Sequence, residues 1–271
     1  MIDALGYTFM QNAVIVSILG SIACGIIGTL VTVNRMSALA GSIAHASFGG
    51  LGLAYLAGFN PLIGATGFAV AGAAAIAAVS SGKRARTDTA MAAMWATGMA
   101  AGLVFIKLSG TYSADLMSWL FGSLLAVSTS DLTFAAVLDI VILLLVTGFY
   151  KEFLAVSFDR EFSMLQGVPS HFIRGLFLIL TALTAVLLMK ITGLIMVIAM
   201  LSIPAAIAGM YTGSLWKMMI LASILAAVFN LAGLSLAWML DLPPGAVIIL
   251  IAAFTYGVSL ILERVRSGTT R

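Results

Sequence analysis

Residues 12–33 read NAVIVSILGSIACGIIGTLVTV, an apolar run without a single charged side chain. A helix of that length spans about 33 Å, slightly more than the hydrocarbon core of a bilayer. Comparable apolar runs follow along the rest of the chain, at 37–58, 61–80, 89–108, 131–150, 171–189, 192–212, 216–239 and 244–263. The sequence therefore predicts an all-α, polytopic membrane helix bundle with eight or nine transmembrane helices.

The composition of the whole chain agrees with this prediction. Of 271 residues, 62% are hydrophobic and 8% are charged, whereas soluble domains carry about 25% charged residues. This excludes a soluble enzyme, a disordered chain and a fibrous protein. The net charge of +3 is too small to indicate nucleic-acid binding, so lipid is the expected surrounding. We expect residues 1–271 to form a single transmembrane domain.

The basic residues predict the orientation of the chain, because they are enriched on the cytoplasmic side of membrane proteins. They form three groups: Lys83, Arg84 and Arg86; Lys151, Arg160 and Arg174; and Arg264, Arg266 and Arg271. Placing all three groups in the cytoplasm also places Arg35 and Lys217 there, which leaves only Lys107 and Lys190 outside. The sequence therefore predicts a multi-pass protein of the cytoplasmic membrane with a cytoplasmic C-terminus.

A tenth apolar stretch, at about 115–127, is too short to cross a bilayer. The span at 89–108 leaves the cytoplasm and the span at 131–150 returns to it. Residues 115–127 must therefore begin and end on the outer side, as a re-entrant segment or half-helix does. Such backbone is tolerated only where protein buries it or where it lines a cavity, which is typical of transporters.

Two ionisable side chains lie inside predicted spans, where charge is costly and is therefore a candidate for function. His45 occupies the most polar span, and an imidazole can bind zinc, manganese or iron. A hydrogen-bonded structural histidine is the alternative. Asp139 lies mid-span and could be a metal ligand, a proton carrier or the buried partner of a polar side chain. Asn230 is expected to form hydrogen bonds between helices.

The longest predicted cytoplasmic loop contains a short amphipathic helix, at about 157–168. Its apolar face is formed at helical spacing by Phe158, Phe162 and Leu165. Asp159 and Glu161 suit the first turn, and Gly167 suits the C-terminal cap before Pro169. The segment could be an ordinary interfacial helix or could dock into a partner protein.

Several motifs, in order and at matching spacing, resemble the zinc/manganese/iron class of ABC transporter permeases. The resemblance covers about residues 12–263. It is carried by the following stretches: FDRE at 158–161 with GVP at 167–169, TGLIMV at 192–197 with LSIPAA at 201–206, DLPPGA at 241–246, and LMSWLFGSLLAV at 116–127.

The resemblance implies a permease that moves a divalent metal ion, either as a homodimer or paired with a related permease. It also implies two cytoplasmic ATPase subunits and an extracytoplasmic metal-binding protein. The helix with Asp159, Glu161 and Gly167 would be the coupling helix, which transmits ATPase closure to the bundle. The chain has no G-x-x-x-x-G-K-[S/T] motif. We therefore expect no ATPase site and no intrinsic cofactor, with ATP bound by a partner subunit and the metal ion as cargo.

One position departs from the family pattern. Many members carry G-D-x-x-S-H-A, in which the Asp and the His share a helix face, whereas this chain has Gly41 in place of the Asp, four residues before His45. A carboxylate supplies hard oxygen ligation, so its loss weakens the case for manganese here. Three explanations stay open: His45 acts alone or with help from Asp139, a partner permease supplies the full site, or the cargo is a different or chelated metal.

Two other classes of function are considered. A secondary transporter could use His45 and Asp139 as a proton relay. An intramembrane enzyme fits less well, because the sequence shows neither a nucleophile–base pair nor a multi-histidine cluster.

Overall fold

A computed structural model of the chain describes residues 6–79, 84–110, 118–122 and 124–268. Every regular element in those residues is helical. Nine of the helices are long and apolar enough to cross a membrane, within the described part of the chain. The prediction of a polytopic helix bundle is therefore confirmed.

The helices follow the apolar runs closely. Their bounds are α1 Thr8–Val33, α2 Ser37–Ala57, α3 Pro61–Val79, α4 Arg84–Ser109, η2 Leu124–Ala126, α6 Thr129–Gly148, α7 Tyr150–Phe158, α8 Arg160–Leu165, α9 Ser170–Thr192, η3 Leu194–Met196, α10 Val197–Tyr211, α11 Leu215–Leu240 and α12 Pro244–Gly268.

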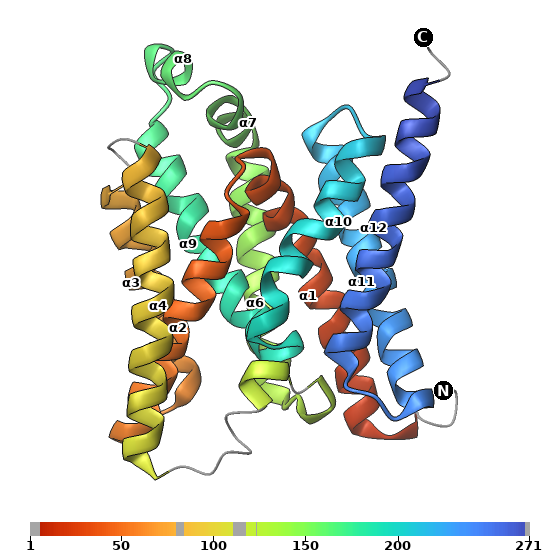
Figure 1. Cartoon of the computed structure of the whole chain (residues 1–271). Coiled ribbons are helices and arrows are strands. Elements are labelled where there is room, and N and C mark those ends of the chain that lie inside the picture. The colour runs from red at the N-terminus through yellow and green to blue at the C-terminus, as the bar shows by residue number, and fades with distance from the viewer. Residues whose placement is uncertain (1–5, 80–83, 111–117, 123, 269–271) are drawn as a thin grey trace.

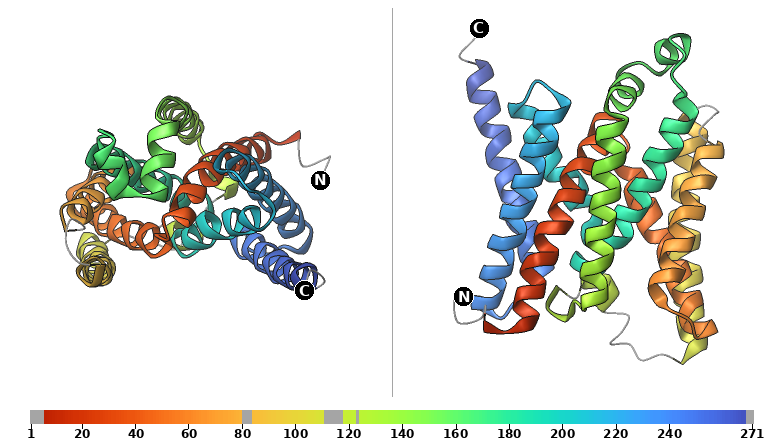
Figure 2. Two further views of the ribbon diagram at one scale, coloured as in Figure 1. Left: turned by 90° about the horizontal axis from the view of Figure 1, so that it is seen from above. Right: turned by 180° about the vertical axis from the view of Figure 1, so that it is seen from behind.

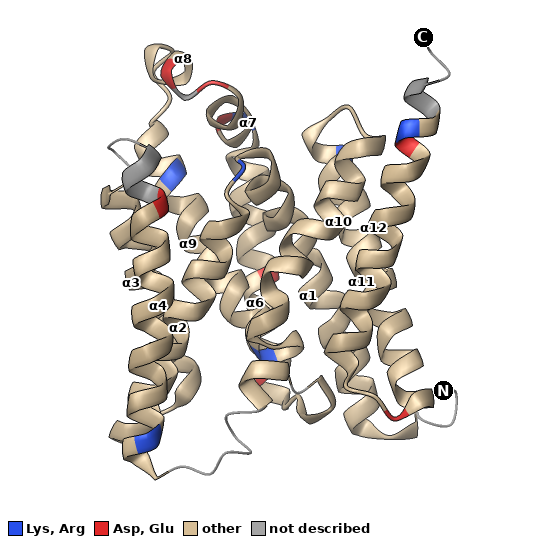
Figure 3. Cartoon of the chain, viewed as in Figure 1, with Lys and Arg blue, Asp and Glu red and all other residues tan. Residues whose placement is uncertain are grey.

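The spanning helices alternate in direction through the bundle (Figure 1). One end of the bundle carries α7, α8 and the end of α12, and the other end carries the start of α1. The helices α2, α3 and α4 form one group and α10, α11 and α12 another, with α1 and α9 between them (Figure 2). Most of the charged residues coloured in Figure 3 lie near the two ends of the bundle, as a membrane-embedded middle requires.

Glycines let α2 pack closely between α3 and α4. A Cβ at Gly50 would lie 2.1 Å from the carbonyl oxygen of Gly64 on α3. On the α4 side, a Cβ at Gly52 would lie 2.5 Å from the carbonyl oxygen of Gly102. Small residues at these positions are therefore required by backbone-to-backbone contact, which drives helix association in membranes.

Polar groups link α1 to its neighbours inside the bundle. Pro204 has no N–H, so the carbonyl of Met200 lacks its helical partner. The Cys24 thiol donates a hydrogen bond to that carbonyl, with a distance of 2.7 Å from Sγ to oxygen. Asn230 on α11 donates to the hydroxyl of Ser21 at 2.9 Å, which confirms the predicted hydrogen bond between helices.

The short segment between α4 and α6 starts and ends at the same end of the bundle, as predicted (Figure 1). Its described part consists of a helical turn at 118–121 and the 3₁₀ turn η2; residues 115–117 and 123 of the predicted segment lie outside the described residues. Gly122 (φ +83°) and Gly193 (φ +94°) place their backbones in direct contact. This contact seats the segment against the end of α9.

Candidate functional site

His45 lies on α2 beside an aromatic ring of α4. Its imidazole stacks on the indole of Trp95, with ring centroids 4.5 Å apart and the planes at 15°. The Nδ1 atom is buried and has no hydrogen-bond partner within the described part of the chain. The imidazole is therefore held in place by stacking, while one ring nitrogen has no protein partner in the described residues.

The space one helical turn before His45 is filled from another helix. A Cβ built on Gly41 would lie 2.3 Å from the Cδ1 methyl of Ile198 on α10. This is the position at which the resemblance leads one to expect a carboxylate. The imidazole therefore stands on α2 with the indole of Trp95 on one side and the aliphatic side chain of Ile198 near the preceding turn.

Asp139 lies in a different interface from His45. Its side chain is 3% exposed, and its oxygens make no hydrogen bond within the described part of the chain. The backbone of Ala23 on α1 faces the carboxyl. Helix α6 packs mainly on α1, whereas α2 packs on α3, α4, α9 and α10. Asp139 is thus a buried carboxyl enclosed by the bundle, and no described contact links it to His45.

Sequence reasoning missed two residues of this site, Trp95 and Ile198. Trp95 carries a signal that could have identified it, because tryptophans in membrane helices favour the interfaces and this one lies near the middle of α4. Ile198 carries no such signal, since an isoleucine in an apolar helix is ordinary.

An ion pair closes the end of the bundle opposite α8. The Lys190 ammonium at the end of α9 donates to the carboxylate of Asp131 in the first turn of α6. Asp131 also accepts from the backbone and hydroxyl of Ser128, which completes a capping box. The same ammonium lies 5.8 Å from the ring centroid of Trp119. These contacts link Trp119 of the short segment to the start of α6 and the end of α9.

The predicted short amphipathic helix is present as α8, but it is shorter than expected. A single helix over about 157–168 is wrong, because the backbone of Asp159 is extended and separates α7 from α8. Phe158 therefore ends α7 and does not share a helix with Phe162. The Asp159 carboxylate accepts a hydrogen bond from the Phe162 N–H at 3.0 Å and caps α8.

The C-terminus of α8 is capped as predicted. Gly167 has φ +81°, its N–H donates to Met164, and the next N–H, of Val168, donates to Ser163. This pair of bonds is the Schellman motif, in which glycine takes the left-handed conformation.

The helix α8 and the residues beside it present apolar side chains to the outside of the bundle. Phe158 is 78% exposed, Phe162 57% and Leu165 86%. Glu161 is also exposed, and basic side chains near this end of the bundle include Lys151 and Arg174. Large apolar side chains exposed next to charged ones are typical of a protein-binding surface.

Comparison with known proteins identifies the family. The model of the ABC 3 transport family matches residues 6–263. The chain belongs to the ABC 3 transport family. The match includes the capped α8 and the His45 region, and it extends into the last spanning helix, α12.

Relatives of this ABC 3 family chain are similar along nearly their whole length. It is 46% identical to an uncharacterised membrane protein of Synechocystis over 97% of this chain and 94% of the relative. It is 34% identical to the manganese transport system membrane protein MntC of Listeria monocytogenes, over 94% and 91%. A solved structure, PsaBC from Streptococcus pneumoniae in complex with Fab, matches with a TM-score of 0.87 and 32% identity, over 95% and 93% of the two chains.

Proposed function

We propose that this chain is the membrane-spanning permease subunit of an ATP-driven importer for a divalent transition metal ion. The observation that carries the proposal is the family match over residues 6–263. The Listeria relative is a manganese transport protein, which supports a metal ion as the cargo. Family membership favours this function over the proton-coupled transporter considered above.

We place the end that carries α7 and α8 in the cytoplasm. The described basic residues near this end are Arg35, Lys151, Arg174, Lys217 and Arg264, whereas Lys107 and Lys190 lie near the other end. This distribution follows the positive-inside rule and puts the end of α12 in the cytoplasm. The other end then faces the extracytoplasmic metal-binding protein that delivers the ion.

The α8 region is the proposed contact with the ATPase subunits. The exposed Phe158, Phe162 and Leu165 offer apolar surface to a groove, and Asp159 and Gly167 cap the two ends of α8. Glu161 stands in the first turn of α8, where it can pair with a basic residue of the partner. ATP binding and hydrolysis belong to that partner, and this chain transmits the movement.

His45 is the proposed metal contact along the path. Its buried Nδ1 can serve as a nitrogen ligand, and imidazole suits zinc, manganese and iron. Among the described residues, no three His, Cys, Asp or Glu side chains gather into a metal site. We therefore expect a passing ion to meet His45 together with a group from a second permease, whether an identical copy or a related chain.

The filled space beside Gly41 bears on the choice of metal. With Ile198 at this position, the site lacks the oxygen ligand that manganese prefers. The explanations left open by the sequence are thus a lone His45, a partner permease with the full site, or a different or chelated metal. Asp139 is too enclosed to reach His45 in this conformation, so we assign it first to the α1–α6 interface.

Reconstitution tests the proposal. Vesicles containing this permease, its ATPase subunits and its metal-binding protein should take up radiolabelled zinc, manganese or iron only when ATP and the binding protein are both present. Omitting either component is the control. Uptake driven by a pH gradient alone, without ATPase subunits, would instead identify a secondary transporter.

A further inference from the structure

The indole of Trp95 covers one face of the His45 imidazole. The two rings are nearly parallel, with 15° between their planes and 4.5 Å between their centroids. A metal ion binds an imidazole nitrogen along its lone pair, which lies in the plane of the ring. A parallel indole therefore covers the face of the imidazole but leaves open the in-plane directions along which its nitrogens bind an ion.

The usual means of orienting a metal-binding histidine is missing here. Such a histidine normally donates a hydrogen bond from its other ring nitrogen to a carboxylate or a carbonyl. Within the described part of the chain, the buried Nδ1 of His45 has no hydrogen-bond partner. Position 41, one turn earlier on the same helix face, is a glycine, and a methyl group of Ile198 fills the space beside it. This leaves the stack on Trp95 as the described contact that can limit rotation of the imidazole.

The backbone contact between α2 and α4 determines where the indole lies. A Cβ on Gly98, one turn after Trp95, would lie 2.5 Å from the Cα of Ala46 and 3.0 Å from the carbonyl oxygen of His45. On the other helix, a Cβ on Gly49 would lie 3.1 Å from the carbonyl oxygen of Gly98. The two helices therefore touch through their backbones beside both rings, and this contact holds the rings in register.

Helix packing alone does not account for Trp95. Its side chain is 42% exposed, whereas an indole that served only to pack α4 on α2 would be buried between them. It lies seven residues after Asp88, where the span begins, which is about 10 Å along the helix axis. Tryptophans favour the membrane interfaces instead. His45 is also only partly buried, so the pair faces the outside of this chain, where an ion can reach the imidazole.

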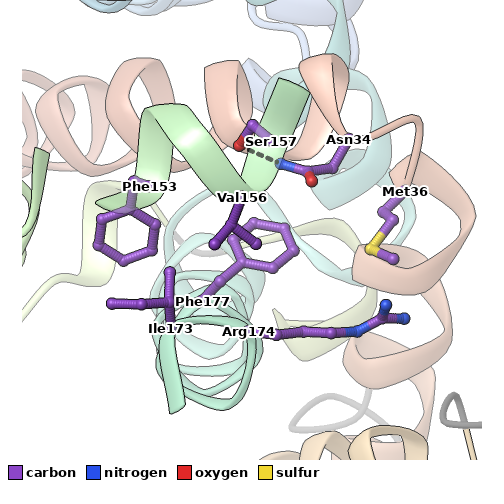
Figure 4. Close-up of a pocket in the computed structure, with 8 residues that line it drawn as sticks. All are labelled: Asn34, Met36, Phe153, Val156, Ser157, Ile173, Arg174 and Phe177. Atoms are coloured by element: carbon purple, nitrogen blue, oxygen red, sulfur yellow. Dashed lines mark hydrogen bonds between the residues drawn. The ribbon is translucent and has the colours of Figure 1, made fainter. Parts of the chain in front are cut away.

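The pair is separate from the cavity at the end of the bundle that carries α7. That cavity, of about 210 Å³, lies between α7, α9 and the turn that joins α1 to α2 (Figure 4). None of its eight lining residues lies on α4. On one side of it, Asn34 donates a hydrogen bond to the Ser157 hydroxyl at 3.0 Å. A variant at Ser157 can therefore serve as a control for changes that do not touch His45.

We propose that Trp95 is a positioning residue of the metal path, which holds the His45 imidazole in the orientation that presents a ring nitrogen to the passing ion. This inference rests on the proposed role of His45 as a metal contact. Stacking orients the ring without the negative charge that a carboxylate partner would add, and such a partner raises the basicity of the ligand. The imidazole is thus oriented without binding the ion more tightly, which suits a path that must release its cargo.

Zinc titration of the purified full-length chain, followed by NMR of isotopically labelled histidine side chains, tests this proposal. The chain has two histidines, and the exposed His171 in the first turn of α9 is an internal reference. Trp95→Leu and Trp95→Met remove the aromatic ring, whereas Trp95→Phe keeps one. In the Leu and Met variants, the His45 signals should lose the shift caused by the indole ring current. Zn²⁺ should bind His45 about two- to tenfold more weakly, the range of one aromatic pair.

Three comparisons serve as controls for that loss of affinity. Trp95→Phe should keep an affinity for Zn²⁺ near that of the wild type, and His171 should be unaffected in every variant. Trp238 on α11 is 43% exposed, much as Trp95 is, and Trp238→Leu should leave zinc binding at His45 unchanged. Ser157→Ala should do the same, whatever its effect on transport. Thermal unfolding shows whether each variant is folded, and Trp95→Met takes the place of Trp95→Leu if the latter is not.

Uptake by reconstituted transporter separates this inference from the proposed function. ATP-driven metal uptake should fall in Trp95→Leu and recover in part in Trp95→Phe. Equal zinc affinity of His45 in Trp95→Leu and Trp238→Leu would overturn the inference, as would an equal loss in Trp95→Leu and Trp95→Phe or the absence of zinc binding at His45 in the wild type. If wild-type transporter takes up no metal with ATP, the proposed function fails, and the NMR titration still decides whether Trp95 positions His45.

Discussion

Replacing Gly167 by alanine tests how the cap of α8 supports coupling. Gly167 has φ +81°, and a Cβ built there meets no atom within 4 Å. The substitution therefore adds no steric clash with the rest of the protein. Its effect comes only from the left-handed backbone, which an alanine adopts with difficulty.

The magnitude follows from that backbone conformation. A non-glycine residue in the left-handed region costs roughly 1–2 kcal/mol. This cost shifts the equilibrium between the capped and open forms of α8 by about 5- to 30-fold toward the open form. Because α8 has only six residues, loss of the cap should release the whole helix.

Two measurements report this change. In the Gly167→Ala variant, hydrogen exchange at the amides of positions 166, 167 and 168 should be about 5- to 30-fold faster than in the wild type, in line with the same free energy. In reconstituted transporter, the number of metal ions imported per ATP hydrolysed should fall, while the spanning helices remain folded.

Gly175→Ala is the matched control. Gly175 lies within α9, and a Cβ built there also meets no atom within 4 Å. Alanine favours a helix interior by about 0.5–1 kcal/mol over glycine, so this variant should keep wild-type exchange in α8 and wild-type coupling. If the two variants exchange and transport alike, the cap of α8 is not what couples the ATPase to the bundle.

Three further predictions concern the packing of the bundle, and each is tested by thermal unfolding of the purified chain. Gly50→Ala should lower the free energy of unfolding by at least the roughly 1–3 kcal/mol typical of overpacking, because its Cβ would lie 2.1 Å from a backbone oxygen. Gly67→Ala is the control: a Cβ there meets open space, so the free energy of unfolding should stay within about 0.5 kcal/mol of wild type. Equal effects of the two variants would contradict the proposed backbone contact. Cys24→Ser should keep the hydrogen bond to the Met200 carbonyl, whereas Cys24→Ala should lose it and lower the free energy of unfolding by about 1 kcal/mol. Equal stability of the two variants would refute a role for that bond. Asn230→Ala should lower the free energy of unfolding by about 0.6–1.7 kcal/mol, the range of hydrogen bonds between membrane helices. An unchanged melting temperature would show that this bond is dispensable.

Most of the fold could be predicted because a bilayer imposes length and composition on every span. The runs at 12–33 and 216–239 match α1 and α11 to within a few residues. The C-terminal cap of α8 was also predictable, since Gly167 acts through local backbone geometry. Asp159 was expected in the first turn of the helix and is instead its N-cap. The break at Asp159 was not predictable, because helical spacing of apolar residues does not register an extended residue between two short helices.

The candidate site was less predictable, because it depends on contacts between distant parts of the chain. His45 was evident as a rare ionisable residue in a span, but its stacking partner Trp95 lies fifty residues away. The side chain that fills the space beside Gly41 comes from Ile198 on a helix much later in the sequence. Only the packing of α2 against α4 and α10 brings these residues together.

Metal uptake by a His45→Phe variant is the most direct test of this permease as a metal pathway. Phenylalanine keeps an aromatic ring to stack on Trp95, whose centroid lies 4.5 Å from that of His45, but it has no nitrogen ligand. We predict that the variant assembles with its ATPase subunits and loses ATP-driven metal uptake in vesicles. Wild-type uptake by a fully assembled His45→Phe transporter would contradict the account.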